Sequence, residues 1–294
     1  MARQTKLIAG EGETIPMKKF INLMSGMTRM LAMMTLLAAA AQAQTSRAAT
    51  ASSHLERGNV WVGKGAFDHA IDDFGLAIAF DPGQAGAWYN RAAARYLKGD
   101  LDGALADFNR ALQINPRYTE AWLDRGAVFY RKGDWDAVIN DNTQAIALNP
   151  RLAQAWNNRG VARQYKGDLD GALADFEQAI KLGLRLAPSY NKCGVARLLK
   201  GDLNEAISDQ NQAIKLDPHF AGAWTDRCAA RRLKGDLCGA LADCGRAIEL
   251  DERNAMAHFN RSAVWKDKSD LGRAGADYDR AIELDPRFAG ARAQ

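Results

Sequence analysis

A 34-residue repeat constrains this chain more than any other feature of its sequence. The tripeptide Lys-Gly-Asp begins at residues 98, 132, 166, 200 and 234, at intervals of 34 residues. Related tripeptides at 64–66 and 268–270 extend the series at both ends. Units of this length cannot bury an apolar face alone, so each must stack on its neighbours. We therefore expect residues 51–288 to form seven tandem units, repeats 1 to 7, which begin at 51, 85, 119, 153, 187, 221 and 255.

Each repeat has the pattern of two helices. Apolar or small side chains recur at i, i+4 and i+7, as in Trp122, Gly126 and Phe129 of repeat 3, which is the spacing of one helix face. The Gly of the tripeptide suits a left-handed turn after the first helix, and the Asp suits the cap of the second. A Pro closes most repeats, because Pro cannot continue a helix. The pattern predicts an all-α fold of helix-turn-helix units.

The period of 34 residues, together with the spacing W-x3-G/A, then A-x3-F-x2-A and a final P, resembles the tetratricopeptide repeat (TPR). The resemblance covers about 80% of the chain. It implies a right-handed superhelical solenoid in which the first helices of the repeats line a concave groove. It also implies a non-enzymatic scaffold for a protein or peptide partner, with no catalytic, cofactor-binding or metal-binding residues.

Three departures from the repeat pattern concern packing. Repeat 4 lacks its closing Pro, so the turn at 183–188 should differ from the others and is a candidate flexible joint. Asn142 and Gln210 replace the large apolar side chain of the second helix in repeats 3 and 5. We expect these two repeats to be less well packed than the others.

An Arg recurs at one position of the first helices, namely Arg57, Arg91, Arg125, Arg159, Arg227 and Arg261. An Asp recurs at one position of the second helices, namely Asp73, Asp107, Asp141, Asp175, Asp209, Asp243 and Asp277. A residue present in almost every repeat most simply serves packing, so we predict structural Arg–Asp salt bridges rather than an anion-binding ladder or acid–base pairs. Repeat 5 has Cys193 in the Arg position, and Lys192 is the expected substitute partner of Asp209.

The resemblance to TPR proteins places the sixth residue of each first helix in the groove. Asn at this position resembles the peptide-holding groove of O-linked N-acetylglucosamine transferase, and an amide both donates to and accepts from a peptide backbone. Tyrosines beside this position are frequent interface anchors. The candidate peptide-binding residues are Asn90, Asn158, Asn260, Asp124 and Asp226, with Tyr89, Tyr96 and Tyr130. Lys192 departs from the pattern, and a merely solvated polar helix face is the alternative.

The first fifty residues have the order of a secretory signal. A short positive start at Met17 precedes the apolar stretch 30–41 and the small-x-small sequence 41–43. We expect translation from Met17, cleavage after Ala43, a linker at 44–50 and a periplasmic or secreted bacterial protein. The apolar stretch is short for a membrane span, and no later stretch approaches 18 apolar residues, so the mature chain should not be membrane-embedded. An uncleaved anchor and a mitochondrial-type presequence are the alternatives.

The charge balance argues against nucleic acid as the partner. The chain holds 39 Lys and Arg and 35 Asp and Glu, a net charge of +4. Residues 44–294 hold 34 cations and 33 anions, a net charge of +1. Proteins that bind nucleic acid usually show a basic excess on one face.

All four cysteines lie in repeats 5 and 6. Cys228 and Cys244 occupy facing core positions of repeat 6, so a disulfide between them is plausible in an oxidising compartment. The alternative is that they are small buried thiols. A ligand- or redox-responsive regulator that uses this cysteine cluster is the second functional hypothesis.

The chain ends in a short stub, residues 289–294, where another repeat would begin. Arrays normally need a polar cap at each end. We expect Tyr278, Ile282 and Leu284 to stay partly exposed and to support weak self-association through this end.

Overall fold

The computed structural model describes residues 6–8 and 14–293. These residues form seven helix pairs, which confirms the all-α repeat fold, and a short hairpin of two strands precedes them. The strands are β1 (Lys6–Ile8) and β2 (Thr14–Pro16), which pair antiparallel. The chain divides into two compact units, 1–114 and 115–294, and each is described by itself below.

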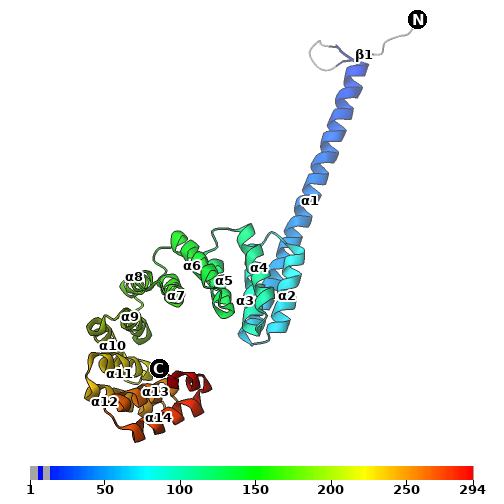
Figure 1. Cartoon of the computed structure of the whole chain (residues 1–294). Helices are drawn as coiled ribbons and strands as arrows, with labels where there is room; N and C mark the ends of the chain where they lie inside the picture. The colour runs from blue at the N-terminus through cyan, green and yellow to red at the C-terminus, as the bar shows by residue number, and fades with distance from the viewer. Residues whose placement is uncertain (1–5, 9–13, 294) are drawn as a thin grey trace. The chain divides into compact units, whose positions relative to one another are not determined.

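The first unit contains the first two helix pairs (Figure 1). Its helices are α1 (Met17–Gly63), α2 (Phe67–Phe80), α3 (Ala85–Lys98) and α4 (Leu101–Ile114). Helix α1 runs without a break through 44–50, where we expected a linker. The physical reason is composition, because no Gly or Pro lies between Gly26 and Gly58 and Ala is frequent there. Cleavage after Ala43 stays a prediction.

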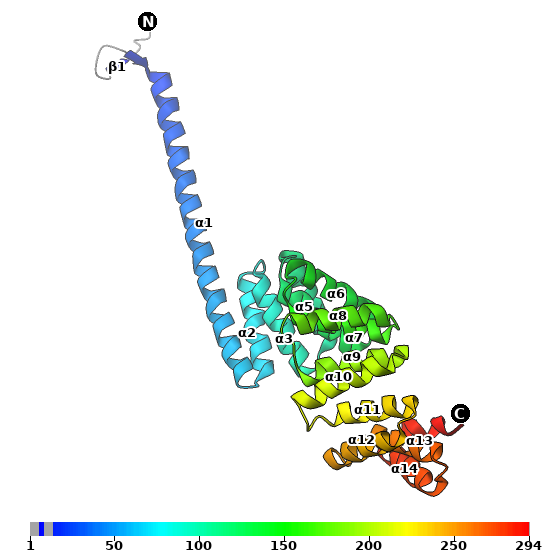
Figure 2. The same cartoon turned by 90° about the vertical axis from the view of Figure 1, so that its left-hand side faces the viewer.

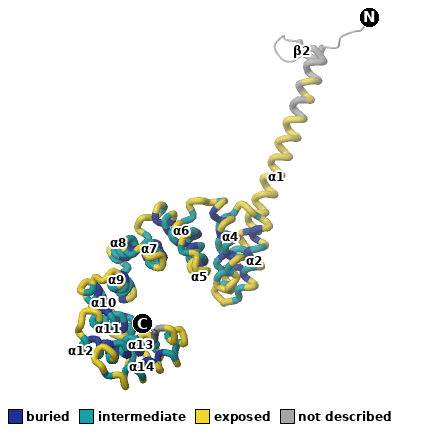
Figure 3. The backbone as a smooth tube through the Cα atoms, in the orientation of Figure 1, coloured by how far each residue is buried: buried dark blue, intermediate teal, exposed yellow. Residues whose placement is uncertain are grey.

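The large side chains of the apolar stretch of α1 are exposed. Six of its side chains are more than half exposed: Met30, Leu31, Met33, Met34, Leu36 and Leu37. Figure 3 shows this stretch as exposed over its length. Within the described part of the chain, no helix has both the length and the apolar character needed to cross a bilayer.

The second unit contains five helix pairs and a final short helix (Figure 2). The pairs are α5 (Thr119–Lys132) with α6 (Trp135–Leu148), α7 (Ala153–Tyr165) with α8 (Leu169–Lys181), α9 (Ala187–Lys200) with α10 (Leu203–Leu216), α11 (Ala221–Lys234) with α12 (Leu237–Leu250), and α13 (Ala255–Asp267) with α14 (Leu271–Leu284). The final helix is the 3-10 helix η1 (Pro286–Ala293).

Stacking in the second unit follows one rule. The second helices α6, α8, α10 and α12 each pack against their own first helix and against the first helix of the next repeat, whereas α14 packs against α13 and η1. The first helices α7, α9, α11 and α13 also contact one another in that order, and in Figure 1 they lie on the inner side of this unit. The fold therefore places equivalent residues of successive first helices side by side.

The core is built where helices approach most closely. One position of every second helix carries an Ala that is at most 1% exposed: Ala77, Ala111, Ala145, Ala179, Ala213, Ala247 and Ala281. Large side chains such as Phe108 and Phe176 fill the space beside them. A small residue at the closest approach lets the helices pack without a void, since cores are dense. Figure 3 shows the buried residues concentrated between helices.

The turn inside each repeat has the geometry predicted for Lys-Gly-Asp. The Gly residues are left-handed, for example Gly99 with φ of 93° and Gly235 with φ of 88°. The following Asp caps the second helix in most repeats, as where Asp100 Oδ1 accepts from the Gly103 amide at 2.9 Å. Ser269 takes the Gly position in repeat 7 and is also left-handed, with φ of 63°.

The turn between repeats also has a recurring geometry. In repeat 3, Asn149 Oδ1 accepts from the Arg151 amide at 3.1 Å, and Trp156 Nε1 donates to the Pro150 carbonyl oxygen at 2.9 Å. After repeat 4 the chain instead turns through Gly183, with φ of 109°, and the Leu184 amide donates to the Ala179 carbonyl oxygen at 3.0 Å. The structure thus confirms that this turn differs, and its flexibility stays a prediction.

The prediction of an open C-terminal end is wrong for Tyr278, whose side chain is 8% exposed. The reason is that η1 folds back over α14. Tyr278 Oη donates to the carbonyl oxygen of Phe288 at 3.0 Å, and the Phe288 ring stacks on Phe259 with centroids 4.9 Å apart. Ile282 and Leu284 are half-buried.

Candidate functional site

In the six repeats that carry the recurring Arg, the Arg–Asp pairs are salt bridges inside the repeat, as predicted. Arg159 Nε donates to Asp175 Oδ2 at 2.9 Å, and Arg159 Nη2 donates to Asp175 Oδ1 at 2.8 Å. The same two-bond arrangement joins Arg91 to Asp107, Arg125 to Asp141, Arg227 to Asp243 and Arg261 to Asp277. Parallel bonds to one carboxylate suit the planar guanidinium fork. These residues therefore hold each helix pair together.

Repeat 5 uses a different cation from the one we predicted. Asp209 accepts from Arg197 Nη1, whereas Lys192 Nζ donates to Asn157 Oδ1 at 2.9 Å. Lys192 comes directly before Cys193 on the helix and so points to another face, toward the preceding first helix. The expectation that Lys192 replaces the missing Arg is thus wrong.

The inner face of the second unit carries polar contacts between successive first helices. Asn191 Nδ2 of α9 donates to Asp226 Oδ2 of α11 at 2.7 Å. Asn260 Nδ2 of α13 donates to the Thr225 carbonyl oxygen of α11 at 3.3 Å. With the bond from Lys192 to Asn157, these contacts run from α7 to α13. We call the residues Asn157, Asn158, Asn191, Lys192, Thr225, Asp226 and Asn260 the first-helix ladder.

Burial shifts the pKa values of two residues of the ladder. It lowers the pKa of Lys192, and it raises the pKa of Asp226 against the opposing effect of the Asn191 hydrogen bond. The side-chain oxygen Oδ1 of Asn191 is buried and has no hydrogen-bond partner among the described residues. One acceptor of the ladder is therefore left unsatisfied inside the packed helices.

The predicted groove residues are divided between the two units. Tyr89, Asn90 and Tyr96 lie on α3 of the first unit, where Asn90 Nδ2 donates to Asn59 Oδ1 at 3.0 Å. Asp124 and Tyr130 lie on α5 of the second unit. The remaining three, Asn158, Asp226 and Asn260, belong to the ladder, and Asn158 Oδ1 accepts from Gln154 Nε2 at 2.7 Å.

Sequence reasoning missed an aromatic cluster at the ends of the first helices. Tyr130 meets Trp135 edge-on with centroids 5.3 Å apart, and Trp135 stacks on Tyr165 at 4.2 Å. Tyr130 is 44% exposed and Tyr165 is 63% exposed. The repeat pattern does not reveal this cluster, because Leu is the commonest residue of the other repeats at the positions of Trp135 and Tyr165.

The cysteines of repeats 5 and 6 divide into two classes. Cys228 of α11 and Cys244 of α12 are joined by a disulfide, with their Cα atoms 5.4 Å apart. Cys193 is buried and Cys238 is exposed, and both are free thiols. Burial raises the pKa of the Cys193 thiol to about 12, so this thiol stays protonated and unreactive at neutral pH.

Family models match three stretches of the array. The model described as TPR repeat matches residues 92–133, and two models described as tetratricopeptide repeat match 153–182 and 187–220. These stretches fall on the helix pairs described above. The chain is a TPR protein. Among curated protein sequences, none matches it.

Solved TPR structures share this fold. A tetratricopeptide repeat protein from Parabacteroides merdae is 18% identical, with a TM-score of 0.66 over 80% of this chain and 93% of its own. MamA is 25% identical, with a TM-score of 0.53 over 56% of this chain and 96% of its own. YrrB, described as a TPR protein with an unusual peptide-binding site, is 18% identical, with a TM-score of 0.50 over 64% of this chain and 98% of its own. The TPR fold is typically non-catalytic.

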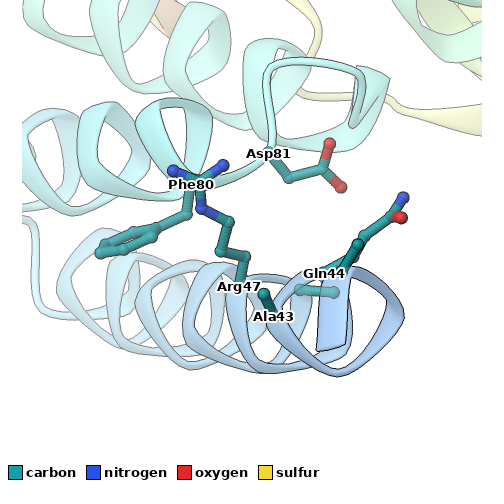
Figure 4. A pocket seen from close by; sticks show the side chains of 7 residues that line it. Ala43, Gln44, Arg47, Phe80 and Asp81 are labelled. Atoms are coloured by element: carbon teal, nitrogen blue, oxygen red, sulfur yellow. The ribbon is translucent and has the colours of Figure 1, made fainter. Parts of the chain in front are cut away.

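One pocket of the TPR protein lies beside the predicted cleavage position. It has a volume of about 530 Å³ and lies between α1 and the end of α2. Figure 4 shows the Arg47 side chain extending from α1 toward Phe80 and Asp81. Ala40 and Ala43 form part of its lining, so cleavage after Ala43 would remove that wall. We assign no ligand to it.

Proposed function

We propose that this TPR protein is a non-enzymatic scaffold that binds an extended protein segment along the first-helix ladder. TPR proteins bind peptide or protein partners. The observation that carries the proposal is the run of polar side chains on α7, α9, α11 and α13, which present amide, ammonium and carboxylate groups at equivalent positions. An extended backbone needs alternating donors and acceptors, which these groups supply.

The aromatic cluster of Tyr130, Trp135 and Tyr165 extends the proposed surface to repeat 3. Its rings are partly exposed and already held by one another. Rigid aromatic side chains give large contact areas at low entropic cost. We therefore place apolar anchors of the segment at this cluster and its backbone contacts at the ladder.

We further propose that the protein acts in a bacterial cell envelope after cleavage behind Ala43. The signal-like order of residues 17–43 and the exposed apolar side chains of α1 support this. The Cys228–Cys244 disulfide also supports it, because disulfides persist in oxidising compartments. Expression in an exporting host should yield a chain that begins at Gln44, and intact-mass analysis would detect an uncut chain.

The binding proposal is tested by capture from an envelope extract with the exported protein as bait. A variant with Asn158 and Asn260 of the ladder changed to Ala should lose the partner. A matched variant with Gln144→Ala and Asn204→Ala, which alters exposed amides on second helices, should retain it. Equal capture by all three baits would remove the ladder from the binding surface.

The second candidate is a redox-responsive regulator. The observation that favours it is that the disulfide joins α11, which carries Thr225 and Asp226 of the ladder, to α12. Reduction would then remove the covalent link that holds α11, and with it Thr225 and Asp226, against α12. Capture before and after reduction separates the two functions, because a plain scaffold should bind the same partner in both states. Weak self-association through the C-terminal end also stays a proposal, to be checked by sedimentation.

A further inference from the structure

Six repeats carry an Arg at the position that Cys193 takes in repeat 5, and Arg159 of repeat 4 shows the three partners of its guanidinium group. The first is the Asp175 carboxylate, with bonds of 2.9 and 2.8 Å. The second is the Trp156 ring, whose centroid lies 4.8 Å from Arg159 Cζ. The third is an acceptor in the preceding repeat, Thr143 Oγ1, at 3.2 Å from Arg159 Nη1.

Repeat 6 has the same arrangement with different side chains. Arg227 binds Asp243 at 2.8 and 2.6 Å and lies over Trp224, with 4.7 Å from Cζ to the ring centroid. Its Nη1 donates to Asn211 Oδ1 of repeat 5 at 2.6 Å. Repeats 4 and 6 therefore share all three partners, whereas Gly75 and Gly245 stand at the preceding-repeat position of repeats 2 and 7 and offer no side-chain acceptor.

Repeat 5 keeps all three partners but not the guanidinium. Asp209, Tyr190 and Glu177 stand 34 residues after Asp175, Trp156 and Thr143. Cys193 occupies the Arg position. The acceptor supplied by the preceding repeat is here the carboxylate of Glu177. A carboxylate is a stronger partner for a cation than the hydroxyl of Thr143 or the amide of Asn211.

A cavity of about 210 Å³ lies at this place, lined by Cys193, Tyr190, Glu177, Asp209 and Arg197 among others. The Asp209 side chain is 15% exposed, whereas those of Asp175 and Asp243 are each 2% exposed. Loss of the Arg side chain has thus opened the carboxylate to a ligand from outside.

Arg197 does not occupy the empty position. It corresponds to Arg163, whose Nη1 binds Asp175 Oδ2 at 2.9 Å while Arg159 is also bound. Arg197 contacts the equivalent oxygen, Asp209 Oδ2, and reaches Glu177 Oε1 at 2.8 Å. Among the described residues, no hydrogen bond to Asp209 Oδ1 is formed, and this is the oxygen that receives the second bond in other repeats.

We propose that the cavity between α8, α9 and α10 is a binding site for a guanidinium group supplied from outside the chain, either an Arg side chain or a small guanidinium compound. Asp209 Oδ1 and Glu177 accept its N–H groups, and the Tyr190 ring offers an aromatic face. A planar guanidinium can direct N–H groups at both carboxylates while its face stacks on the ring, whereas an ammonium is a compact, strongly hydrated charge that lacks this fork.

The local charge is compatible with this ligand. Two carboxylates, Glu177 and Asp209, stand beside two cations, Arg197 and the exposed Lys181 at the cavity. A bound guanidinium brings the sum to +1, which equals the sum of Arg159, Arg163 and Asp175 in repeat 4. Burial also raises the pKa of Asp209, and a second cation would favour its ionised form. This site is separate from the first-helix ladder and does not rest on the proposed function.

The test measures thermal unfolding of the full chain with arginine amide and with lysine amide. We expect arginine amide to raise the melting temperature by a few °C at saturation and lysine amide to raise it less. Cys193→Ala, which keeps the cavity open, should respond as the natural chain does. Cys193→Arg should melt at a higher temperature without ligand and should lose the response, because its own guanidinium fills the site.

A tripeptide with a central Arg and both ends blocked distinguishes the two sources. A response to arginine amide alone assigns a small guanidinium compound, and a response to the peptide as well assigns an Arg side chain. The absence of a response to both ligands in the natural chain overturns the proposal. So does an equal response in Cys193→Arg, which would place binding elsewhere. Asp209→Asn, with folding checked by circular dichroism, should abolish the response.

Discussion

Arg159 holds the buried carboxylate of Asp175 with two hydrogen bonds of 2.9 and 2.8 Å, and its guanidinium lies over the Trp156 ring. The Asp175 side chain is 2% exposed and that of Arg159 is 11% exposed. One contact therefore ties the two helices of repeat 4 together while it satisfies a charge that water cannot reach.

Arg159→Ala should lower the free energy of unfolding by about 3 kcal/mol, because the Asp175 charge then stays buried with only Arg163 beside it. Urea unfolding followed by circular dichroism measures the change. Arg280→Ala is the control, since it removes an exposed pair with Glu283 and should cost less than about 0.5 kcal/mol. Similar losses in both variants would show that burial does not set the strength of the repeated pair.

Gln210→Met should raise the free energy of unfolding by about 1–2 kcal/mol. The Gln210 side chain is fully buried, and neither amide atom has a hydrogen-bond partner among the described residues. Met has a similar volume and no polar group to desolvate. Asn142→Leu should gain less, because it also removes the bond from Asn142 Nδ2 to the Val138 carbonyl oxygen at 2.8 Å. A destabilised Gln210→Met would contradict the packing argument for repeat 5.

Asp226→Asn should stabilise the protein at neutral pH and have little effect near pH 3. Burial raises the pKa of Asp226, so the folded state holds this proton above the unfolded-state value of about 3.9. Stability therefore falls as the pH rises through the folded-state pKa, and the loss is complete above it. Asn removes the charge and still accepts from Asn191. Urea unfolding at several pH values measures the difference, with Glu205→Gln on the exposed face of α10 as the control variant.

Loss of the Cys228–Cys244 disulfide should lower the free energy of unfolding by about 3 kcal/mol. The disulfide closes a loop in the unfolded chain and so reduces the entropy of the unfolded state. The two residues are 16 apart. Melting with and without reductant measures the effect, and a variant with both residues changed to Ala should no longer respond to reductant. Unreduced, denatured protein should titrate two thiols, Cys193 and Cys238. Four thiols in freshly isolated protein would contradict the disulfide.

Ser269→Gly should stabilise repeat 7 by about 1 kcal/mol, because Ser is strained in the left-handed conformation that Gly adopts freely. Ser269 has φ of 63°, close to its Gly counterparts. The reciprocal change, Gly235→Ser, should destabilise repeat 6 by a similar amount. Equal stability of all three proteins in urea would mean that the turn relaxes to accommodate a side chain.

The features that the repeat determined are those that need only local geometry. Helix pairs, the left-handed Gly99 and the cap at Asp100 follow from backbone preferences that recur every 34 residues. The bond from Arg159 to Asp175 was also predictable, because two helices of fixed length and turn bring the same positions together in each repeat. The place of Asn158, Asp226 and Asn260 on the first helices followed from the same register.

Tertiary structure alone decided what depends on neighbouring repeats. Lys192 bonds to Asn157 and leaves Asp209 to Arg197, because side-chain direction and not sequence proximity selects the partner. Tyr278 is buried only because the last residues fold back as η1. The cavity at Cys193 likewise needs α8, α9 and α10 together. The repeat pattern predicts contacts between positions that recur within each repeat. These contacts instead join neighbouring repeats, or α14 and η1, through side chains that do not all recur every 34 residues.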